Sequence, residues 1–572
     1  MSRNRWLAAL AACALTTAAL VQSTASVAAP PPVEAAAPGG PGAMSHFDLA
    51  RKDCVGTARN TTSKVWFTVA GGVLSDVYYP TIDNTNIETL QYIVTDGATF
   101  TDLQSRDTTH TVEPLDDSGM SCRVTSTDKN GKYTLVTDYA TDPHHNSVAM
   151  QTVLKPAPGV KNLSVYVRMD ATVNGNGGGG DPVSQNAGAD DAVIDTSTGS
   201  PVPVSIDTNT STIAANRDYA TPVFVALRAD RPFLAASSGY AGTASDGLAQ
   251  LDTDHELSVA YTNATDGNVV QIAQVDARAH RPFTIAVGFG ADRAEAIAAA
   301  GSTANANFKQ LARQYTHGWD DYIDGLVGPG DPPGLDRDER AEIRRTYNTS
   351  AAVLKASEDK TFPGAVVASL ASPWGQAVAA GDPALTYFGS YREVFARDLY
   401  ETFTGLMAAG DTATAEDTVR FLFEHQQLGD GSFPRNSLIN GKLAPDSFGV
   451  QLDEIAYPIL MARMVGLTSA DFYTGEIRPA ADFLVAHGPS FGSERWEEQS
   501  GFSPSTIAAE IAGLAAAGKI AEINGDMVRA RIYRATADHY QRSIKDWTVT
   551  TNGPLSDDPY FIRLSKNADP DS

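Results

Sequence analysis

Residues 494–505 contain side chains suited to acid–base chemistry. Trp496, Glu497 and Glu498 follow one another there, between two predicted helices. Acid-catalysed cleavage of a glycosidic bond needs a carboxyl group that stays protonated near neutral pH. An adjacent apolar ring or a second carboxylate favours that protonated form. We therefore take Glu497 as a candidate general acid, although by spacing alone a solvated acidic loop with a packed tryptophan is the more common arrangement.

Arg397 and Asp398 form a second candidate pair, ahead of a helical stretch. A guanidinium and a carboxylate held side by side can bind sugar hydroxyls through directional hydrogen bonds. An ordinary ion pair on a helix is the simpler interpretation of these two residues alone. Residues 430–437 and 451–454, taken by themselves, predict only a turn and the start of a helix.

Composition and charge narrow the classes of partner. The chain has 572 residues, of which 42% are hydrophobic and 19% charged, and its formal net charge is -25. Such a chain can bury large cores. A polyanion is repelled by nucleic-acid phosphates and by anionic membrane surfaces, so we expect neither as a partner. Neutral substrates such as sugars are compatible with this charge.

The N-terminus carries a targeting signal. Arg3 and Arg5 precede an apolar run over residues 6–21, and Ser26-Val27-Ala28 has the small-x-small pattern of a cleavage site. Residues 1–29 are therefore predicted to be a secretory signal peptide. A lipoprotein site at Cys13 is the alternative, but the apolar run continues past it.

Removal of the signal peptide leaves two cysteines, Cys54 and Cys122. In an exported protein these are expected to form one disulfide, the alternative being two buried free thiols. No metal motif stands out: His144 and His145 beside Asp142 lack a third ligand, so a solvated turn is the better interpretation. A structural calcium ion would need only clustered oxygens, but no particular loop is indicated.

Hydrophobic periodicity divides the rest of the chain. Residues 30–44 are rich in Pro, Gly and Ala and predict a linker. Residues 45–293 alternate with period two, as in the two apolar runs that flank Gly71-Gly72, and predict an antiparallel sandwich. Helical spacing begins near residue 294, in a linking region that extends to residue 336. About seven helices then follow over residues 337–572 and predict a bundle or toroid. Their expected spans are 337–358, 391–409, 412–427, 452–466, 469–487, 503–522 and 525–546.

Several motifs in a fixed order resemble glycoside hydrolase family 15, and within it the bacterial glucoamylases and glucodextranases. The helical half contains LKASEDK at 354–360, SPWG at 372–375, RDLY at 397–400, DGSFP at 430–434, QLDE at 451–454 and RWEE at 495–498. The N-terminal half adds SKVWF at 63–67 and DVYYPT at 76–81. The likeness covers nearly all of the chain after the linker.

This resemblance implies a β-supersandwich, a linking helix and an (α/α)6 barrel of twelve helices with the active site in the barrel. It assigns Glu497 as the general acid and Glu498 as a sugar contact. Arg397 and Asp398 would bind the terminal glucose. Trp374, Phe395 and Trp496 complete the expected substrate site. The implied reaction is exo-hydrolysis of starch, maltooligosaccharides or dextran, without a cofactor. Water attacks with inversion, which needs a second carboxylate about 6.5–9.5 Å from the acid, and β-glucose is released.

The sequence also departs from the family pattern. The general base of the family lies on a late barrel helix, and residues 498–572 offer no position that matches it. With about seven helices predicted instead of twelve, we expect a barrel truncated at its C-terminus, with apolar helix faces exposed. A carbohydrate-binding remnant without activity is therefore the alternative. Phe395-Ala396 and Leu438 stand where the family commonly has Trp-Pro and Trp, so the preference between α-1,4 and α-1,6 linkages stays open.

Two further enzyme classes have weaker support in the sequence. Gly488-Pro489-Ser490-Phe491-Gly492 matches the G-x-S-x-G pattern of serine hydrolases, but that motif needs a strand before the serine, and a helix is predicted there. Phosphorolytic enzymes with a sandwich-plus-barrel plan would use phosphate in place of water. No dedicated phosphate motif supports them, because the glycine run at residues 177–180 lacks the strand-then-helix setting.

Overall fold

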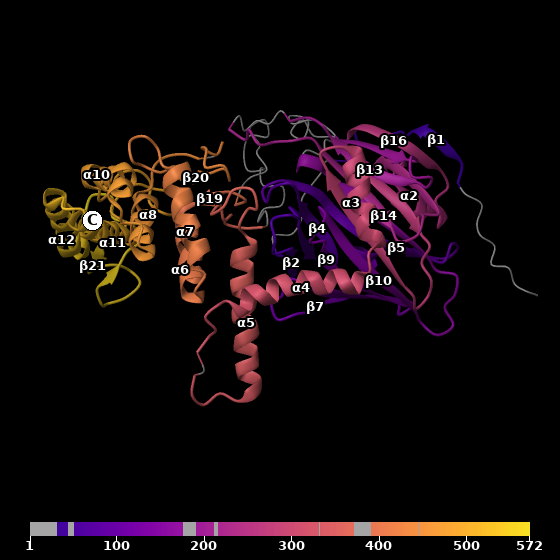
Figure 1. The fold of residues 1–572 in the computed structure, drawn as a ribbon, viewed down its shortest axis with the longest axis horizontal. Helices are drawn as coiled ribbons and strands as arrows, with labels where there is room; N and C mark the ends of the chain where they lie inside the picture. The colour runs from indigo at the N-terminus through magenta and orange to yellow at the C-terminus, as the bar shows by residue number, and fades with distance from the viewer. Residues whose placement is uncertain are drawn as a thin grey trace, which may run out of the picture.

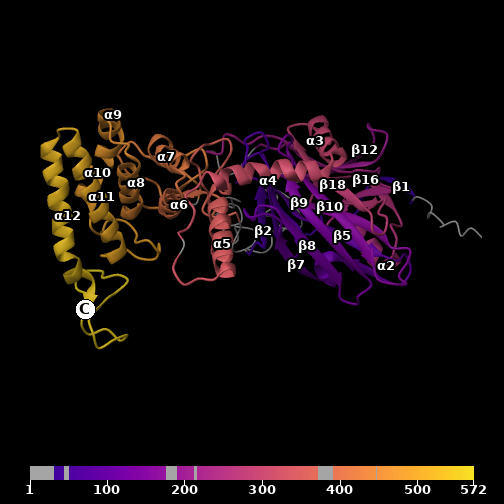
Figure 2. The ribbon, with the colours of Figure 1, turned by 60° about the horizontal axis from the view of Figure 1, so that its bottom comes forward.

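The computed structural model describes residues 31–43, 51–175, 190–210, 216–330, 332–370, 391–445 and 447–572. A sheet-rich N-terminal part and a helical C-terminal part lie at opposite ends of an elongated molecule (Figure 1). Helix α4 (Phe308–Asp324) runs along the sheets, and α5 (Arg337–Ala356) stands between the two parts in both ribbon views (Figure 2). The predicted signal peptide 1–29 and Trp374 lie outside the described residues.

Two large sheets make up the N-terminal part. Among the described residues one sheet has ten strands in the order β1-β16-β12-β13-β14-β18-β10-β9-β8-β7. The other has eight, in the order β15-β17-β11-β5-β4-β3-β2 with β6 beside β5. The first nine strands are β1 (Val33–Ala36), β2 (Cys54–Thr57), β3 (Trp66–Ala70), β4 (Val73–Tyr78), β5 (Thr85–Thr95), β6 (Thr101–Leu103), β7 (Thr108–Pro114), β8 (Cys122–Asp128) and β9 (Tyr133–Thr141). The next nine are β10 (Ser147–Pro156), β11 (Ser164–Ala171), β12 (Asp190–Asp195), β13 (Val202–Asp207), β14 (Val223–Ala229), β15 (Ala235–Tyr240), β16 (Ala260–Gly267), β17 (Val269–Val275) and β18 (Pro282–Gly290).

The predicted sandwich is confirmed by these sheets, whose strand pairs are antiparallel except for β1 with β16. The hairpin expected around Gly71-Gly72 is formed by β3 and β4. Side chains from both sheets interdigitate in one hydrophobic cluster. A buried hydrogen bond of 2.7 Å joins Tyr92 Oη on one sheet to Thr152 Oγ1 on the other. The disulfide between Cys54 on β2 and Cys122 on β8 also links the two sheets. Small helical segments connect some strands: α1 (Gln104–Asp107), η1 (Val173–Gly175) and α2 (Gly247–Asp254).

Two boundaries differ from the sequence-based expectation. Strand β1 lies inside the segment predicted as a linker. It forms because its backbone pairs with β16 in the register Val33↔Ala260, and this pairing does not depend on an apolar side-chain pattern. The single helical stretch expected from residue 294 is broken into α3 (Arg293–Asn305) and α4. Helix α3 packs on β14 and β18, where the bare backbone of Gly288 lets it approach: a Cβ there would lie 2.2 Å from Ala300 N. Thus α3 packs as part of the sandwich, and Asn307 caps a new helix after it.

Long-range hydrogen bonds join the sandwich to the helical part. Trp66 Nε1 donates to Ala356 O at 2.9 Å, and Ile82 N donates to Asp359 Oδ2 at 2.9 Å. The ammonium group of the half-buried Lys360 donates to two carbonyls of the sandwich at 2.6 Å each. Trp66 and Ile82 also belong to the hydrophobic cluster of the helices, so the two parts share a core at their junction.

The helical part contains the expected helices with two kinds of local change. Its elements are α5, β19 (Val394–Phe395), α6 (Ala396–Ala409), α7 (Thr412–Phe421), η3 (Leu422–Gln426), β20 (Asn436–Ser437), α8 (Leu452–Val465), α9 (Ala470–Phe472), η4 (Tyr473–Ile477), α10 (Arg478–His487), α11 (Pro504–Ile523), α12 (Met527–Thr548), β21 (Val549–Thr550) and β22 (Tyr560–Phe561). The helix predicted at 391–409 begins only at Ala396, after β19. The segments predicted at 412–427 and 469–487 each include a π-helical turn, η3 and η4.

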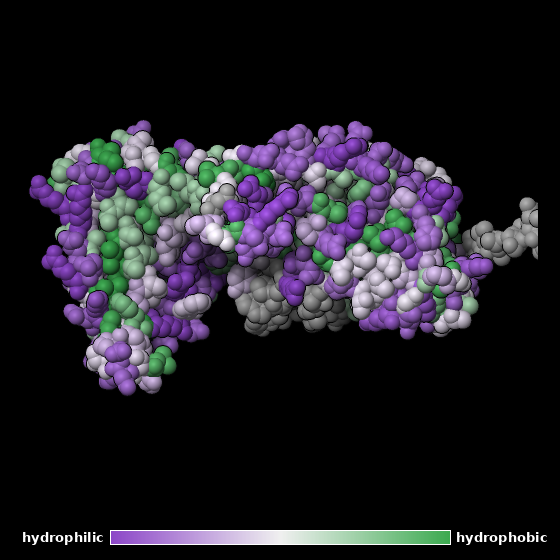
Figure 3. Space-filling model, turned by 90° about the horizontal axis from the view of Figure 1, so that it is seen from below, coloured by the Kyte–Doolittle hydropathy of each residue, from purple (hydrophilic) through white to green (hydrophobic). Residues whose placement is uncertain are grey.

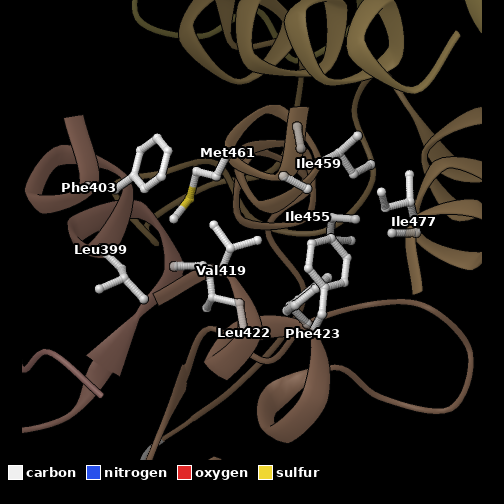
Figure 4. Packing of buried hydrophobic residues seen from close by; sticks show 14 of the residues in the cluster. Leu399, Phe403, Val419, Leu422, Phe423, Ile455, Ile459, Met461 and Ile477 are labelled. Carbon is white, nitrogen blue, oxygen red and sulfur yellow. The ribbon is translucent and has the colours of Figure 1, made fainter. Parts of the chain in front are cut away.

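Apolar side chains of these helices form one core. Figure 4 shows Leu399 and Phe403 of α6, Val419 of α7 and Ile455 and Ile459 of α8 gathered in it. Helices α11 and α12 leave some apolar surface exposed, as expected for an open helical array. Figure 3 shows apolar residues between hydrophilic ones at this end of the molecule. The exposed side chains there include Ile523, Met527, Val528 and Ile532.

Candidate active site

The N-terminus of α6 and a short hairpin form one side of the candidate site. Strand β19 pairs with β20, which places Phe395 opposite Asn436. Arg435, next in sequence, stacks its guanidinium 5.5 Å from the centre of the Phe395 ring. Arg397 lies in the first turn of α6 directly after this hairpin. The hairpin therefore sets the direction from which Arg397 enters the site.

Arg397 is held by residues at the start of α8. Its Nε donates to Asp453 Oδ2 at 2.8 Å, and its Nη2 lies 3.3 Å from Glu454 Oε1. Nη2 also donates to Gln451 Oε1. The simple interpretation of an ion pair on one helix is thus wrong for Arg397, because its partners come from a second helix. Asp398 lies exposed beside it, in the first turn of α6.

Two fully buried carboxyl groups lie near Asp453. Glu454 is fully buried, and burial raises the pKa of its carboxyl group well above the ordinary value, with Arg397 opposing the shift. Glu510 on α11 is equally buried, and burial raises its pKa well above the ordinary value, with Asp453 adding to the shift. Neither side chain has a hydrogen-bond partner among the described residues. Both groups therefore favour the neutral, protonated form.

Glu497 lies in the loop between α10 and α11. Its backbone is in the left-handed region, with φ of 65°. Arg435 Nη1 donates to Glu497 Oε2 at 2.6 Å, and Gln451 Nε2 donates to Oε1 at 3.1 Å. The Glu497 side chain is 26% exposed. Since Gln451 also accepts from Arg397, one glutamine side chain links the predicted acid to the predicted sugar-binding arginine.

The other predicted site residues differ in how far they are exposed. Trp496 is 60% exposed beside Glu497, and Phe395 is buried beneath the Arg435 guanidinium. Glu498 is exposed, and its carboxylate accepts a hydrogen bond from Arg563. Trp374 lies outside the described residues. The structure thus brings Glu497 and Arg397 together through Gln451 and sets Phe395 beside them through Arg435.

Three residues of the site were not singled out from the sequence. Arg435, Gln451 and Asp453 occurred in segments that alone indicated only a turn and a helix start. The available signal was the order of the motifs, since 430–434 and 451–454 both lie between the Arg397 and Glu497 segments. Their individual roles depend on contacts across 46–62 positions of sequence, which no local pattern encodes.

The rival sites are not supported. Helix α10 ends at His487, so Ser490 follows a helix and lacks the strand that a nucleophile elbow requires. Within the described part of the chain no group of three or more His, Cys, Asp or Glu side chains is placed to hold a metal ion. None of the described helices combines the length and apolar character needed to span a membrane.

Comparisons with known proteins agree with this architecture. Residues 37–324 match the family "Glucodextranase, domain N", and residues 439–572 match "Glycosyl hydrolases family 15". A glucoamylase of Clostridium sp. (strain G0005) is 34% identical over 534 residues, which cover 93% of this chain and 70% of that protein. A crystal structure of a bacterial glucoamylase complexed with acarbose superposes with a TM-score of 0.82 at 32% identity, covering 94% of this chain and 73% of that one.

These likenesses define the class of protein as a glycoside hydrolase with a sheet-rich N-terminal part and a helical C-terminal part. The identity and coverage place the chain in glycoside hydrolase family 15.

Proposed function

We propose that the protein hydrolyses α-glucosidic bonds at the non-reducing ends of α-glucans, with inversion, and releases β-glucose. The observation that carries this proposal is the hydrogen-bonded link from Glu497 through Gln451 to Arg397. A proton donor and a group that binds sugar hydroxyls must lie close together to act on the same sugar ring. The glucoamylase relatives and the complex of one of them with acarbose support the choice of substrate class.

Each residue has a chemical role in this proposal. Glu497 donates its proton to the glycosidic oxygen while water attacks the opposite face of the sugar. Arg397, already held by Asp453, presents its remaining N–H groups to hydroxyl oxygens, and exposed Asp398 accepts hydrogen bonds from hydroxyl groups. A glycosidic oxygen that approaches Glu497 Oε2 has to replace the contact from Arg435 Nη1. Inversion also needs a general base, to which we assign no residue.

The proposed place of action is outside the cell. The predicted signal peptide and the disulfide between Cys54 and Cys122 both support export, because disulfides persist in oxidising compartments. The hydrolysis itself needs only water and carboxyl groups, so we propose no cofactor.

The direct test incubates the purified full chain with maltose, isomaltose, starch and dextran and follows the anomer of released glucose by NMR. We expect β-glucose as the first product. Glu497→Gln should lower kcat by about 10²–10⁴-fold, the usual contribution of a general acid. Glu416→Gln is the matched control, since the ion pair of Glu416 within the described part of the chain is a partly exposed one with Arg420 on α7.

Three outcomes would contradict the proposal. First release of α-glucose excludes inversion, and unchanged turnover in Glu497→Gln excludes that residue as the acid. Binding of maltooligosaccharides without any release of glucose would instead support the alternative, a carbohydrate-binding protein without activity.

A further inference from the structure

A segment near residue 563 lies against the loop that carries Glu497. Phe502 N donates to Ser565 O at 2.7 Å, and Ser565 N donates to Phe502 O at 3.0 Å. Gly501 makes this approach possible, because a Cβ at that position would lie 2.5 Å from Ser565 O. The two segments are therefore joined by a backbone bridge immediately before α11.

Glu494 is the buried acid of the loop, with 2% of its surface exposed. Its Oε2 accepts from Trp496 N at 3.0 Å, and its Oε1 accepts from Arg563 Nη2 at 2.5 Å. The backbone carbonyl of Glu494 accepts from Glu497 N at 2.8 Å. Glu494 therefore accepts hydrogen bonds from the backbone N–H groups of Trp496 and Glu497 and from the guanidinium of Arg563.

Arg563 also contacts the far end of the loop. Its Nη1 donates to Glu498 Oε2 at 2.8 Å, so one guanidinium bridges the residues at 494 and 498 on either side of Glu497. The planar, forked guanidinium can donate in two directions at once, whereas a lysine ammonium acts as a single point charge. Arg563 also supplies the positive charge that a buried carboxylate such as Glu494 needs.

The backbone conformation of Glu497 explains why the loop needs these contacts. Glu497 adopts a left-handed backbone conformation that is strained for a non-glycine residue and persists only when its surroundings impose it. The loop between α10 and α11 has little regular secondary structure to impose it. The contacts of Glu494 and Arg563 span this turn, in addition to the hydrogen bonds that the Glu497 side chain accepts from Arg435 and Gln451.

We propose that Glu494 and Arg563 are positioning residues that hold the turn at Glu497 in its strained conformation, and so aim the Glu497 carboxyl group at the substrate. This inference rests on the proposed function for its effect on catalysis, but not for its effect on the loop. Neither residue is assigned a contact with the sugar. Glu494→Gln should therefore lower kcat and leave KM nearly unchanged, whereas Arg563→Gln also releases Glu498, a predicted sugar contact, and can raise KM as well.

The test compares Arg563→Gln, Arg563→Lys and Glu494→Gln in the full chain. We expect kcat to fall by about 10–100-fold in Arg563→Gln and Glu494→Gln, as for misplacement of a catalytic group by about 1 Å. Arg563→Lys should recover part of the loss, because it restores the charge but not the two-way bridge. Arg542→Gln is the control, since the ion pair of Arg542 among the described residues is an exposed one with Asp538 on α12.

A second readout needs no activity. Trypsin can cleave after Arg495, inside the loop, and the rate of this cleavage reports how often the loop opens. We expect faster cleavage at Arg495 in Arg563→Gln and Glu494→Gln, with unchanged rates at other sites by mass spectrometry. In the double variant the two effects should be less than additive, because both changes break the same contact.

The outcomes separate the two proposals. Unchanged kcat and unchanged cleavage in Arg563→Gln would overturn the positioning role while leaving the proposed function intact. An inactive wild type with faster cleavage only at Arg495 in the variants would keep the hold on the loop and overturn the proposed function. Faster cleavage at all sites, with no recovery by lysine, would reduce Arg563 to a general structural residue and overturn the inference.

Discussion

The two sides of the candidate site are held in place by different means. Arg397 stands on a regular helix, and its partners Asp453 and Glu454 belong to a second buried helix. Glu497 lies in a loop with a strained backbone, and its carboxyl group is held by side-chain hydrogen bonds from Arg435 and Gln451. The position of the sugar-binding side is therefore fixed by packing of the helical core, whereas the position of the acid side is fixed by individual side-chain contacts. Changes on the first side should therefore alter stability most, and changes on the second should alter turnover most.

Arg397→Leu should give the largest loss of stability. It leaves the buried Asp453 carboxylate without its positive partner, and removal of one member of a buried ion pair costs about 3–5 kcal/mol. Urea unfolding measures this change. Arg542→Leu, on the exposed face of α12, should change it by less than about 0.5 kcal/mol. Equal effects of the two variants would contradict the buried role of Arg397.

The buried carboxyl groups should make stability depend on pH. Because burial raises the pKa of Glu510 in the folded state, the folded protein binds a proton that the unfolded chain releases above its ordinary pKa. Stability should therefore fall as pH rises from about 5, by up to about 1.4 kcal/mol per pH unit for such a group. Glu510→Gln should flatten this fall, as measured by urea unfolding at several pH values. A wild-type stability that does not fall from pH 5 to 8 would contradict the prediction.

Gln451→Met tests the link between the two sides. Methionine is similar in size to glutamine. It has neither the N–H donor that contacts Glu497 nor the oxygen acceptor that contacts Arg397. Leaving such buried groups short of partners costs about 1–3 kcal/mol. We expect kcat/KM to fall by about tenfold or more, which corresponds to a loss of about 1.4 kcal/mol or more in transition-state stabilisation. A stability loss with unchanged kinetics would show that the link serves only the fold.

Trp496→Ala should change stability least. Its ring is 60% exposed, so its removal should alter the free energy of unfolding by about 0.5 kcal/mol or less. If the ring stacks on a sugar, KM for maltooligosaccharides should rise several-fold, which steady-state kinetics would show. An unchanged KM would remove Trp496 from the substrate site.

Much of the fold could be read from local patterns. Period-two alternation gave the sandwich, and helical spacing placed helices at 337–358 and 452–466, close to the observed α5 and α8. The break at Ala306 and the strand β1 could not be read in this way. The first depends on α3 docking against β14 and β18, and the second on backbone pairing with β16.

The sequence by itself determined the alternation of apolar residues, the order of the family motifs and the chemical types of Glu497, Arg397 and Asp398. These are local properties, set by residues a few positions apart. Only the tertiary structure decided that Gln451 links Glu497 to Arg397. The same holds for the hydrogen bonds that Arg435 donates to Glu497 and Arg563 donates to Glu494. Such contacts join residues 46–69 positions apart, and their existence depends on how packed helices and loops are oriented in space.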